Sequence, residues 1–216
     1  MRFEEWEPIY LEILEDFKFS RAQDEEAAAL LAGLLDGKRI CDDSCLKKRI
    51  GTVVTVCGDA PCLSRDLDTK ELCGTVIAAD GATTELMRRD IVPDLVVSDL
   101  DGEVEYLMEA NRRGAVLMIH AHGDNMAALR LYVPRFTGLV VGTTQSRPFG
   151  VIRNFGGFTD GDRAVILAHH FAAIDVELIG FDFLVPKEKK GRDREVKLKK
   201  LSWARRLIES SAPHPH

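Results

Sequence analysis

The sequence lacks the features that mark secreted, membrane-spanning and nucleic-acid-binding chains. Its first seven residues include three glutamates, which is not the pattern of a secretory signal peptide. No apolar run approaches the length that crosses a bilayer, about 20 residues. Acidic residues outnumber basic ones, 35 to 29, and the net charge is −6, so no broad basic face is expected. We therefore predict a cytoplasmic protein that binds neither nucleic acid nor a membrane.

Several common phosphate-binding and hydrolytic motifs are also missing. The chain contains no Gly-x4-Gly-Lys-Ser/Thr loop and no Gly-x-Gly-x-x-Gly fingerprint, which argues against a P-loop NTPase and a dinucleotide-binding enzyme. It contains no Gly-x-Ser-x-Gly elbow, so an α/β-hydrolase is disfavoured as well.

Cysteine is scarce and odd in number, with five residues in 216. This does not predict a disulfide framework. Cys41 and Cys45 have the spacing of half a zinc site, but no second pair of Cys or His stands at a matching distance. We predict that the cysteines are free thiols that behave as small apolar residues.

The hydrophobic pattern predicts a doubly wound α/β fold. Apolar residues at helical spacing predict two N-terminal helices, at residues 3–19 and 24–35. From Gly51 onward, short runs of Val, Ile and Leu alternate with helical stretches, which is typical of a mainly parallel sheet with helices on both faces. The expected strands are 52–57, 75–79, 95–97, 116–119, 139–141 and 176–179, and the expected helices between them include 83–89, 103–113 and 159–173. We divide the chain into an N-terminal helical segment, 1–46, and an α/β domain, 47–212.

Polar residues follow each of the predicted strands. Because the carboxyl ends of parallel strands share one edge of the sheet, these residues are expected to line a ligand site there. Asp80 and Gly81 follow one strand, and Asp99 and Asp101 follow the next. Clustered carboxylates repel one another unless a cation lies between them, and their hard oxygens favour Mg²⁺. We predict a metal site at Asp80, Asp99 and Asp101, although Asp99 and Asp101 would equally suit an ordinary Asx turn.

Two further segments are candidates for nucleotide binding. Gly157 precedes a helix that begins near Thr159, and Thr159 and Asp162 have the spacing of a capping box. The helix terminus also favours phosphate, so Asp160 and Asp162 are predicted to contact metal, ribose or acceptor. Thr143 and Thr144, after another strand, are added as nucleotide contacts. Near the C-terminus, the lysines of a last helix are predicted to hold phosphate: Lys197, Lys199 and Lys200.

The segment His120-Ala121-His122-Gly123-Asp124 allows two interpretations. A His-x-His pair with an aspartate is a reasonable zinc ligand set, as in a zinc hydrolase. The neighbouring carboxylates favour contacts to phosphate or acceptor instead. If a general base operates, we assign it to Asp124 or His122.

The combination of motifs resembles a known family. Ala79-Asp80-Gly81-Ala82 and the run from Pro93 to Asp101 are similar to thiamine pyrophosphokinases. The archaeal 6-hydroxymethyl-7,8-dihydropterin pyrophosphokinases resemble the chain more closely. Their motifs match His120–Asn125, Asn154–Asp162, Gly180–Phe183 and Lys197–Leu201, in order, within a likeness that covers roughly residues 52–208. Gly102 follows the Asp-x-Asp where thiamine enzymes have Ser, and too little chain remains for their C-terminal β-domain.

This resemblance implies a Mg²⁺-dependent transfer of diphosphate from ATP to 6-hydroxymethyl-7,8-dihydropterin, with release of AMP. Catalytic roles fall to Asp101, Asp124 and His122. The alternatives are thiamine pyrophosphokinase activity and a non-catalytic nucleotide-binding module. The partners implied are the two small-molecule substrates, and we also expect a homodimer.

Overall fold

A parallel sheet forms the centre of the protein in the computed structural model, which describes residues 1–187 and 193–211. The strands lie in the order β1-β6-β5-β4-β3-β2-β8, and β7 pairs with β6. Their bounds are β1 Arg39–Ile40, β2 Val53–Cys57, β3 Thr75–Ala79, β4 Leu95–Ser98, β5 Val116–Ala121, β6 Leu139–Thr144, β7 Ile152–Arg153 and β8 Asp175–Ile179. Every pair of named strands is parallel, so the predicted mainly parallel sheet is confirmed.

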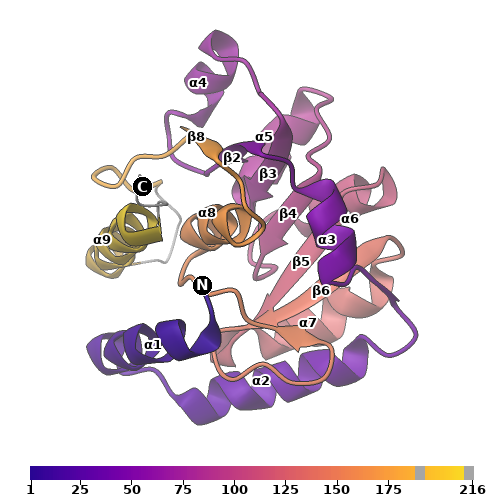
Figure 1. Cartoon of the computed structure of the whole chain (residues 1–216), viewed down its shortest axis with the longest axis vertical. Helices are drawn as coiled ribbons and strands as arrows, with labels where there is room; N and C mark the ends of the chain where they lie inside the picture. Colours follow the sequence, from indigo (N-terminus) through magenta and orange to yellow (C-terminus); the bar gives the residue numbers. More distant parts are fainter. Residues whose placement is uncertain (188–192, 212–216) are drawn as a thin grey trace.

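Helices connect the strands and extend the chain at both ends (Figure 1). Their bounds are α1 Phe3–Phe17, α2 Arg21–Leu34, α3 Asp43–Arg49, α4 Leu63–Thr69, α5 Gly81–Arg88, α6 Val104–Arg112, α7 Met126–Tyr132, α8 Asp160–His170 and α9 Arg194–Ser211. Two short 3₁₀ turns, η1 Gly123–Asn125 and η2 Val133–Arg135, flank α7. Among these helices of the described chain, none is both long and apolar enough to cross a membrane.

The two faces of the sheet carry separate apolar cores. Leu31 of α2, Leu86 of α5 and Leu107 of α6 pack into one core, together with buried strand residues. Leu46 of α3 and Leu167 of α8 pack into the core on the other face. Helices therefore cover both faces, as a doubly wound fold requires.

The N-terminal segment is tied to the rest of the molecule at several points. β1 pairs with β6 in the main sheet. The end of α1 contacts α9, where Asp16 accepts hydrogen bonds from Trp203 Nε1 and Lys199 Nζ. The two predicted N-terminal helices are present, whereas the division of the chain at residue 46 stays a prediction. Its other limit, residue 212, lies outside the described residues.

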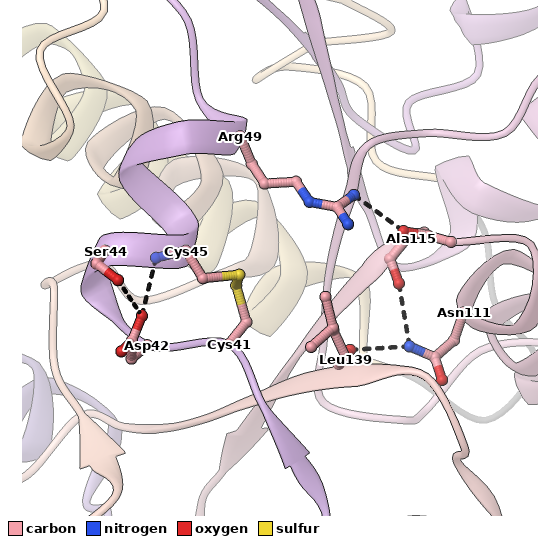
Figure 2. The surroundings of a disulfide bond; sticks show 9 residues. Cys41, Asp42, Ser44, Cys45, Arg49, Asn111, Ala115 and Leu139 are labelled. Carbon is pink, nitrogen blue, oxygen red and sulfur yellow. Dashed lines mark hydrogen bonds between the residues drawn. A yellow bond between two sulfur atoms is a disulfide. The ribbon is translucent and has the colours of Figure 1, made fainter.

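The structure corrects the prediction for two of the cysteines. Cys41 and Cys45 form a disulfide between the end of β1 and the first turn of α3 (Figure 2). Asp42 caps the same helix by accepting a hydrogen bond from the Cys45 backbone N–H at 2.8 Å. The sequence spacing did not reveal the pairing, because the turn that brings the two thiols together depends on this cap. Cys57, Cys62 and Cys73 are free, as expected.

Candidate functional site

A cavity of about 670 Å³ lies at the carboxyl edge of the sheet. Its walls include residues that directly follow β2, β3, β4, β5, β6 and β8, among them Asp59, Asp80, Asp99, His122, Gln145 and Phe181. The N-terminus of α8 and one side of α9 complete the walls. The strand ends therefore converge on one cavity, as expected for a parallel sheet.

Three aspartates meet inside this cavity. Asp80, Asp99 and Asp101 each offer a carboxylate oxygen, and these oxygens lie within 4.8 Å of one another. Asp80 is buried, Asp99 is partly buried and Asp101 is exposed. An all-oxygen donor set fits Mg²⁺, which typically takes one or two protein carboxylates and completes its shell with water and phosphate oxygens.

The backbone around Asp80 is shaped to present its carboxylate. Asp80 has a φ of 37°, which is unusual for a residue other than glycine. Its N–H donates to Val97 O at 2.8 Å, and its Oδ1 accepts from Ser98 Oγ at 2.6 Å. A Cβ at position 102 would lie 2.5 Å from Asp80 Oδ2, so only glycine leaves room for this carboxylate. The two hydrogen bonds hold Asp80 against the end of β4, and Gly102 leaves the space that its carboxylate occupies.

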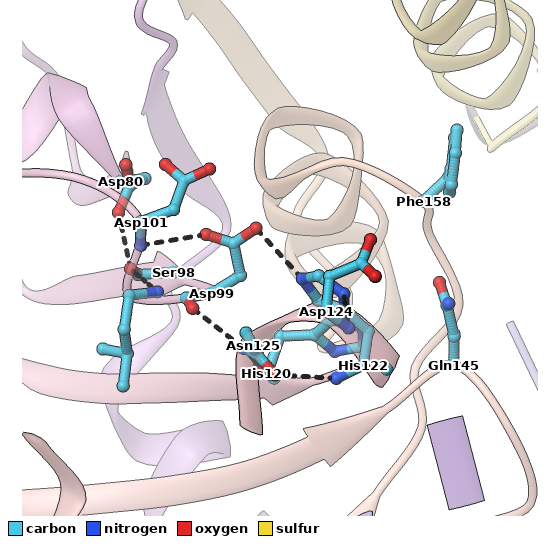
Figure 3. A network of polar contacts seen from close by, with 12 residues as sticks. Asp80, Ser98, Asp99, Asp101, His120, His122, Asp124, Asn125, Gln145 and Phe158 are labelled. Atoms are coloured by element: carbon cyan, nitrogen blue, oxygen red, sulfur yellow. Dashed lines mark hydrogen bonds and ion pairs between the residues drawn. The ribbon is translucent and has the colours of Figure 1, made fainter. Parts of the chain in front are cut away.

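Asp99 and Asp101 form an Asx turn and still reach the cluster. Leu100, between them, has a φ of 66°, and its side chain is buried in the core. The Asp101 N–H donates to Asp99 Oδ1 at 3.2 Å. The turn points both carboxylates toward Asp80, as Figure 3 shows. The two alternatives left open by the sequence, a turn and a metal clamp, are therefore compatible.

The loop after β5 contacts the cluster through His122. His122 Nε2 lies 3.3 Å from Asp99 Oδ2, and His122 Nδ1 accepts from the Asp124 N–H at 3.3 Å (Figure 3). Asn125 ties the loop together by donating from Nδ2 to Asp99 O and to His120 O. Both His122 and Asp124 line the cavity. Because Nδ1 accepts from the Asp124 N–H, the ring donates from Nε2 to Asp99.

The zinc interpretation of this loop finds no support in the geometry. Among the described residues, the three aspartates are the one group whose ligand atoms come together closely enough to hold a metal ion. His120, His122 and Asp124 do not form such a group. The His-x-His pair instead places its rings side by side, with centroids 6.1 Å apart.

The first turn of α8 brings one carboxylate to the cavity and turns the other away. Asp160 lines the cavity, and burial together with the charges of Asp99 and Asp80 raises its pKa well above the ordinary value. Asp162 is fully buried and accepts from the backbone N–H groups of Phe158 and Thr159. The predicted capping box between Thr159 and Asp162 is confirmed. Burial raises the pKa of Asp162 to about 6.

The predicted nucleotide contacts divide between the cavity and the interior. Gly81 lines the cavity at the start of α5. Thr143 and Thr144 are buried, and their hydroxyls bond to protein groups: Thr143 to His120 and Ile119 O, Thr144 to the Ser146 N–H. Gly157 has a φ of 96°, and a Cβ there would lie 2.6 Å from the Cα of Arg163. The geometry thus gives these last three residues a structural explanation.

The three predicted lysines near the C-terminus lie on two different sides of α9. Lys197 and Lys200 line the cavity. Lys200 Nζ lies 5.7 Å from the ring centroids of both Phe19 and Phe158. Lys199 faces the other way and pairs with Asp16 of α1. Helical spacing explains the split, because residues 197 and 200 share one face of α9, which residue 199 does not.

Arg163 is a cavity residue that no sequence pattern indicates. Its side chain is buried and lines the cavity from the first turn of α8. In the sequence it is one charged residue within a helix that was assigned by its apolar periodicity, and such residues usually face solvent. Four other cavity residues, Phe19, Gln23, Gln145 and Phe158, were likewise not singled out.

Fold and cavity together define the class: a doubly wound α/β protein with a carboxylate site at the carboxyl edge of its sheet. Residues 38–188 match the family described as 6-hydroxymethylpterin diphosphokinase, MptE-like, and the chain belongs to this family of enzymes. The Pyrococcus furiosus 6-hydroxymethyl-7,8-dihydropterin pyrophosphokinase is 43% identical, over 97% of this chain and 94% of the relative.

Two further relatives carry the same name. The Methanothermobacter thermautotrophicus protein is 42% identical, over 97% of this chain and 94% of its own. The Methanocaldococcus jannaschii protein is 38% identical, over 96% of this chain and 95% of its own. The family resemblance drawn from the sequence motifs is therefore confirmed.

Proposed function

We propose that this protein transfers diphosphate from ATP to 6-hydroxymethyl-7,8-dihydropterin, with Mg²⁺ bound and AMP as the second product. Three relatives named for this pyrophosphokinase, each aligned over nearly the whole chain, support the acceptor. The observation that carries the proposal is the group of carboxylates from Asp80, Asp99 and Asp101 inside the cavity.

The size and lining of the cavity suit two small substrates. Its volume, about 670 Å³, falls within the range of about 300–1,000 Å³ that is usual for small-molecule sites. Asp59, paired with Lys187, and Phe181 follow β2 and β8 at one end of the cavity. Gln145 follows β6 at the other end, where Phe19 and Phe158 also line the wall side by side. The carboxylates follow β3 and β4 between the two ends. Each end thus offers aromatic rings beside polar groups, which suits a flat heterocycle.

The reaction requires positioning and charge neutralisation more than covalent chemistry. The acceptor's hydroxymethyl oxygen forms a bond to the β-phosphorus, and the bond from that phosphorus to the oxygen bridging the α- and β-phosphates breaks. AMP leaves with the bridging oxygen. Asp80, Asp99 and Asp101 would hold Mg²⁺, which neutralises phosphate charge when bound. Lys197 and Lys200 face the cavity and would contact phosphate oxygens.

A product assay tests this function directly. The protein is incubated with ATP, Mg²⁺ and reduced hydroxymethylpterin, and the nucleotides and pterins are separated by chromatography. We expect AMP and a pterin diphosphate in equal amounts. ADP instead of AMP would indicate a simple kinase, and turnover with thiamine alone would move the protein to the thiamine enzymes. ATP binding without turnover of either acceptor would favour a nucleotide-binding module.

Three expectations about the protein's setting remain predictions: a cytoplasmic location, a homodimer and the lack of nucleic-acid partners. Sedimentation analysis tests the second, and a binding assay with DNA and RNA at low salt tests the third.

A further inference from the structure

Arg163 carries a buried cationic group that its protein neighbours satisfy only in part. The residue is 3% exposed. Nη2 donates to Phe158 O at 3.3 Å, while Nε has no hydrogen-bond partner. No carboxylate among residues 1–187 and 193–211 forms a salt bridge with this guanidinium. Burying a charged group without a full set of partners is costly, so an anionic or strongly polar ligand is expected at its cavity side.

His120 presents a second unsatisfied nitrogen in the same wall. Its ring is 2% exposed, and Nδ1 lies 3.1 Å from Thr143 Oγ1. Thr143 Oγ1 also lies 3.2 Å from Ile119 O, to which only the hydroxyl can donate. The single hydroxyl proton is thereby used, so Nδ1–H must donate to Thr143. The neutral ring consequently has a bare lone pair at Nε2, which is buried and without a partner.

The two side chains lie beside the carboxylate cluster. Both line the cavity that holds Asp80, Asp99 and Asp101. The ring of His120 packs on that of His122, whose Nε2 reaches Asp99. Arg163 interacts electrostatically with Asp162, Asp160, Asp99 and Asp24, none of which forms a salt bridge with it, and its charge also acts on His120. An unused donor and an unused acceptor therefore stand together next to the predicted metal site.

We propose that Arg163 and His120 contact the reacting groups: Arg163 binds the diphosphate being transferred, and His120 Nε2 accepts a hydrogen bond from the attacking hydroxyl. This inference rests on the proposed function. A guanidinium donates several hydrogen bonds in one plane, which suits phosphate oxygens. A bare imidazole nitrogen aligns a hydroxyl by accepting a hydrogen bond from it. This hydrogen bond orients a lone pair of the hydroxyl oxygen toward phosphorus.

The acceptor oxygen uses a lone pair to form the new bond to the β-phosphorus, and the bridging oxygen leaves with the electrons of the broken bond as part of AMP. The hydroxyl proton passes to solvent water as the new bond forms. Burial and the charge of Arg163 hold the pKa of His120 well below its usual value, so the neutral ring keeps its role as the hydrogen-bond acceptor that orients the hydroxyl. Arg163 stays protonated throughout and offsets the charge on the moving diphosphate.

Variants of each residue separate this role from a structural one. Arg163→Lys keeps the charge but loses the planar fork, and Arg163→Ala leaves space that added guanidinium can fill. His120→Asn keeps a donor near the Nδ1 position for Thr143 and removes Nε2. His169→Asn is the matched control, since His169 also has an unpartnered buried Nδ1 but does not line the cavity.

We expect kcat for AMP formation to fall about 10²–10³-fold in Arg163→Ala. We expect a loss of about 10²-fold in His120→Asn, the lower end of what proton-accepting groups contribute. The KM for ATP should rise in Arg163→Ala, by a smaller factor than kcat falls, and should stay near the wild-type value in His120→Asn. His169→Asn should match wild type in both constants. Guanidinium at millimolar concentration should restore part of the activity of Arg163→Ala and none in Asp101→Asn.

The proposal is overturned if folded Arg163→Lys and His120→Asn both keep kcat within about threefold of wild type, a change no larger than one ordinary hydrogen bond gives. It is also overturned if added guanidinium restores no more activity to Arg163→Ala than it restores to Asp101→Asn. Should Arg163→Ala fail to fold, Arg163→Lys decides the case.

If wild type makes no AMP from any acceptor, the proposed function fails instead. Calorimetry with α,β-methylene-ATP, which cannot transfer diphosphate, then tests Arg163 alone: weaker binding by Arg163→Lys supports the contact, and equal binding removes it.

Discussion

At the scale of single residues, Asp101 gives the sharpest test of the metal site. It is exposed within the cluster and lies against the cavity. We predict that Asp101→Asn reduces AMP formation by about 10²-fold or more, because loss of a metal ligand removes several kcal/mol of charge stabilisation. The fold should be unchanged, since an amide of the same size replaces the carboxylate. Turnover at saturating Mg²⁺ and circular dichroism measure the two effects.

The matched control for this variant is Asp90→Asn. Asp90 pairs with Arg113 on the surface, and its side chain is 85% exposed. This substitution makes the same chemical change away from the cavity and should leave turnover unaltered. Near-normal turnover in Asp101→Asn would remove Asp101 from the metal site.

Residue-level prediction from sequence succeeded where a local pattern carried the information. Asp99 and Asp101 directly follow a strand, and Asp80 follows its neighbour, so the geometry of parallel strands brings them together. Arg163 could not be found in this way. Its importance depends on the burial of one helix face against the sheet, which no short motif records.

At the scale of elements, the N-terminus of α8 predicts a pH dependence of stability. Burial raises the pKa of Asp162 to about 6, above the ordinary 3.8. Between these values the folded chain keeps a proton that the unfolded chain has released. The stabilisation that protonated Asp162 gives the folded chain is therefore complete below about pH 4 and is lost as pH rises through 6. The difference between the folded and unfolded pKa of Asp162 corresponds to about 3 kcal/mol of unfolding free energy.

The comparison with Asp162→Asn isolates this effect, because the amide cannot titrate. Urea unfolding at intervals from pH 4 to pH 7 should show a steeper decline for wild type than for the variant. Parallel curves for the two proteins would mean that the pKa of Asp162 is not raised in the folded state.

A second element-level prediction concerns the anchoring of α1 and α2 to the site. Asp24 of α2 is buried and accepts from Tyr10 Oη at 2.7 Å, Gln145 Nε2 at 2.8 Å and the Gly123 N–H at 2.9 Å. Tyr10→Phe removes one donor from a buried carboxylate and should lower the unfolding free energy by about 1–3 kcal/mol. Chemical denaturation measures this loss.

Tyr132→Phe serves as the control for Tyr10→Phe, since among the described residues its hydroxyl has no hydrogen-bond partner. A loss of stability in Tyr10→Phe no greater than in Tyr132→Phe would show that the contact to Asp24 contributes nothing. Because Gly123 adjoins His122, a rise in the KM for the acceptor would extend the role of α1 to the cavity.

The disulfide gives a third prediction at this scale. Cys41 and Cys45 are four residues apart, so their bond closes a short loop. By the loop-entropy model, reduction should lower the unfolding free energy by about 2 kcal/mol. Turnover should not change, because neither residue lines the cavity. Alkylation of the denatured, unreduced protein followed by mass spectrometry should label three cysteines; five labels would contradict the bond.

Secondary-structure elements were predictable in proportion to their length and periodicity. The six longer strands and three of the helices between them, α5, α6 and α8, carry continuous or periodic apolar runs, and the structure places them close to the expected bounds. β1 and β7 have two residues each, too few for a pattern. α4 and α7 have seven residues each, which is also short for periodicity to distinguish a helix from a loop.

At the scale of the whole molecule, one geometric rule explains why the sequence indicated the site. A parallel sheet sends all its strands' carboxyl ends to one edge, so separate motifs along the chain converge without any knowledge of their contacts. The chain ends follow no such rule. α9 borders the cavity through packing on α8, and α2 borders it through packing on β6; both depend on side chains far apart in sequence.

The clustered carboxylates also predict how the whole molecule responds to ligand. Carboxylate oxygens within 4.8 Å of one another repel, and a divalent cation between them offsets that repulsion, so Mg²⁺ with ATP should stabilise the native state. At a free concentration 100 times Kd, binding adds about 2.7 kcal/mol of unfolding free energy. For a chain of this size that corresponds to a rise in Tm of about 5–10 °C.

Asp101→Asn tests whether the three carboxylates bind the cation together. Without metal, the Tm of each protein gives the baseline for its own ligand-induced shift. With Mg²⁺ and ATP, the Tm of Asp101→Asn should rise less than that of wild type. Scanning calorimetry of both proteins, with and without EDTA, measures each shift. Equal ligand-induced shifts would mean that the carboxylates do not share a cation, and the charge-based account of this cavity would then be wrong.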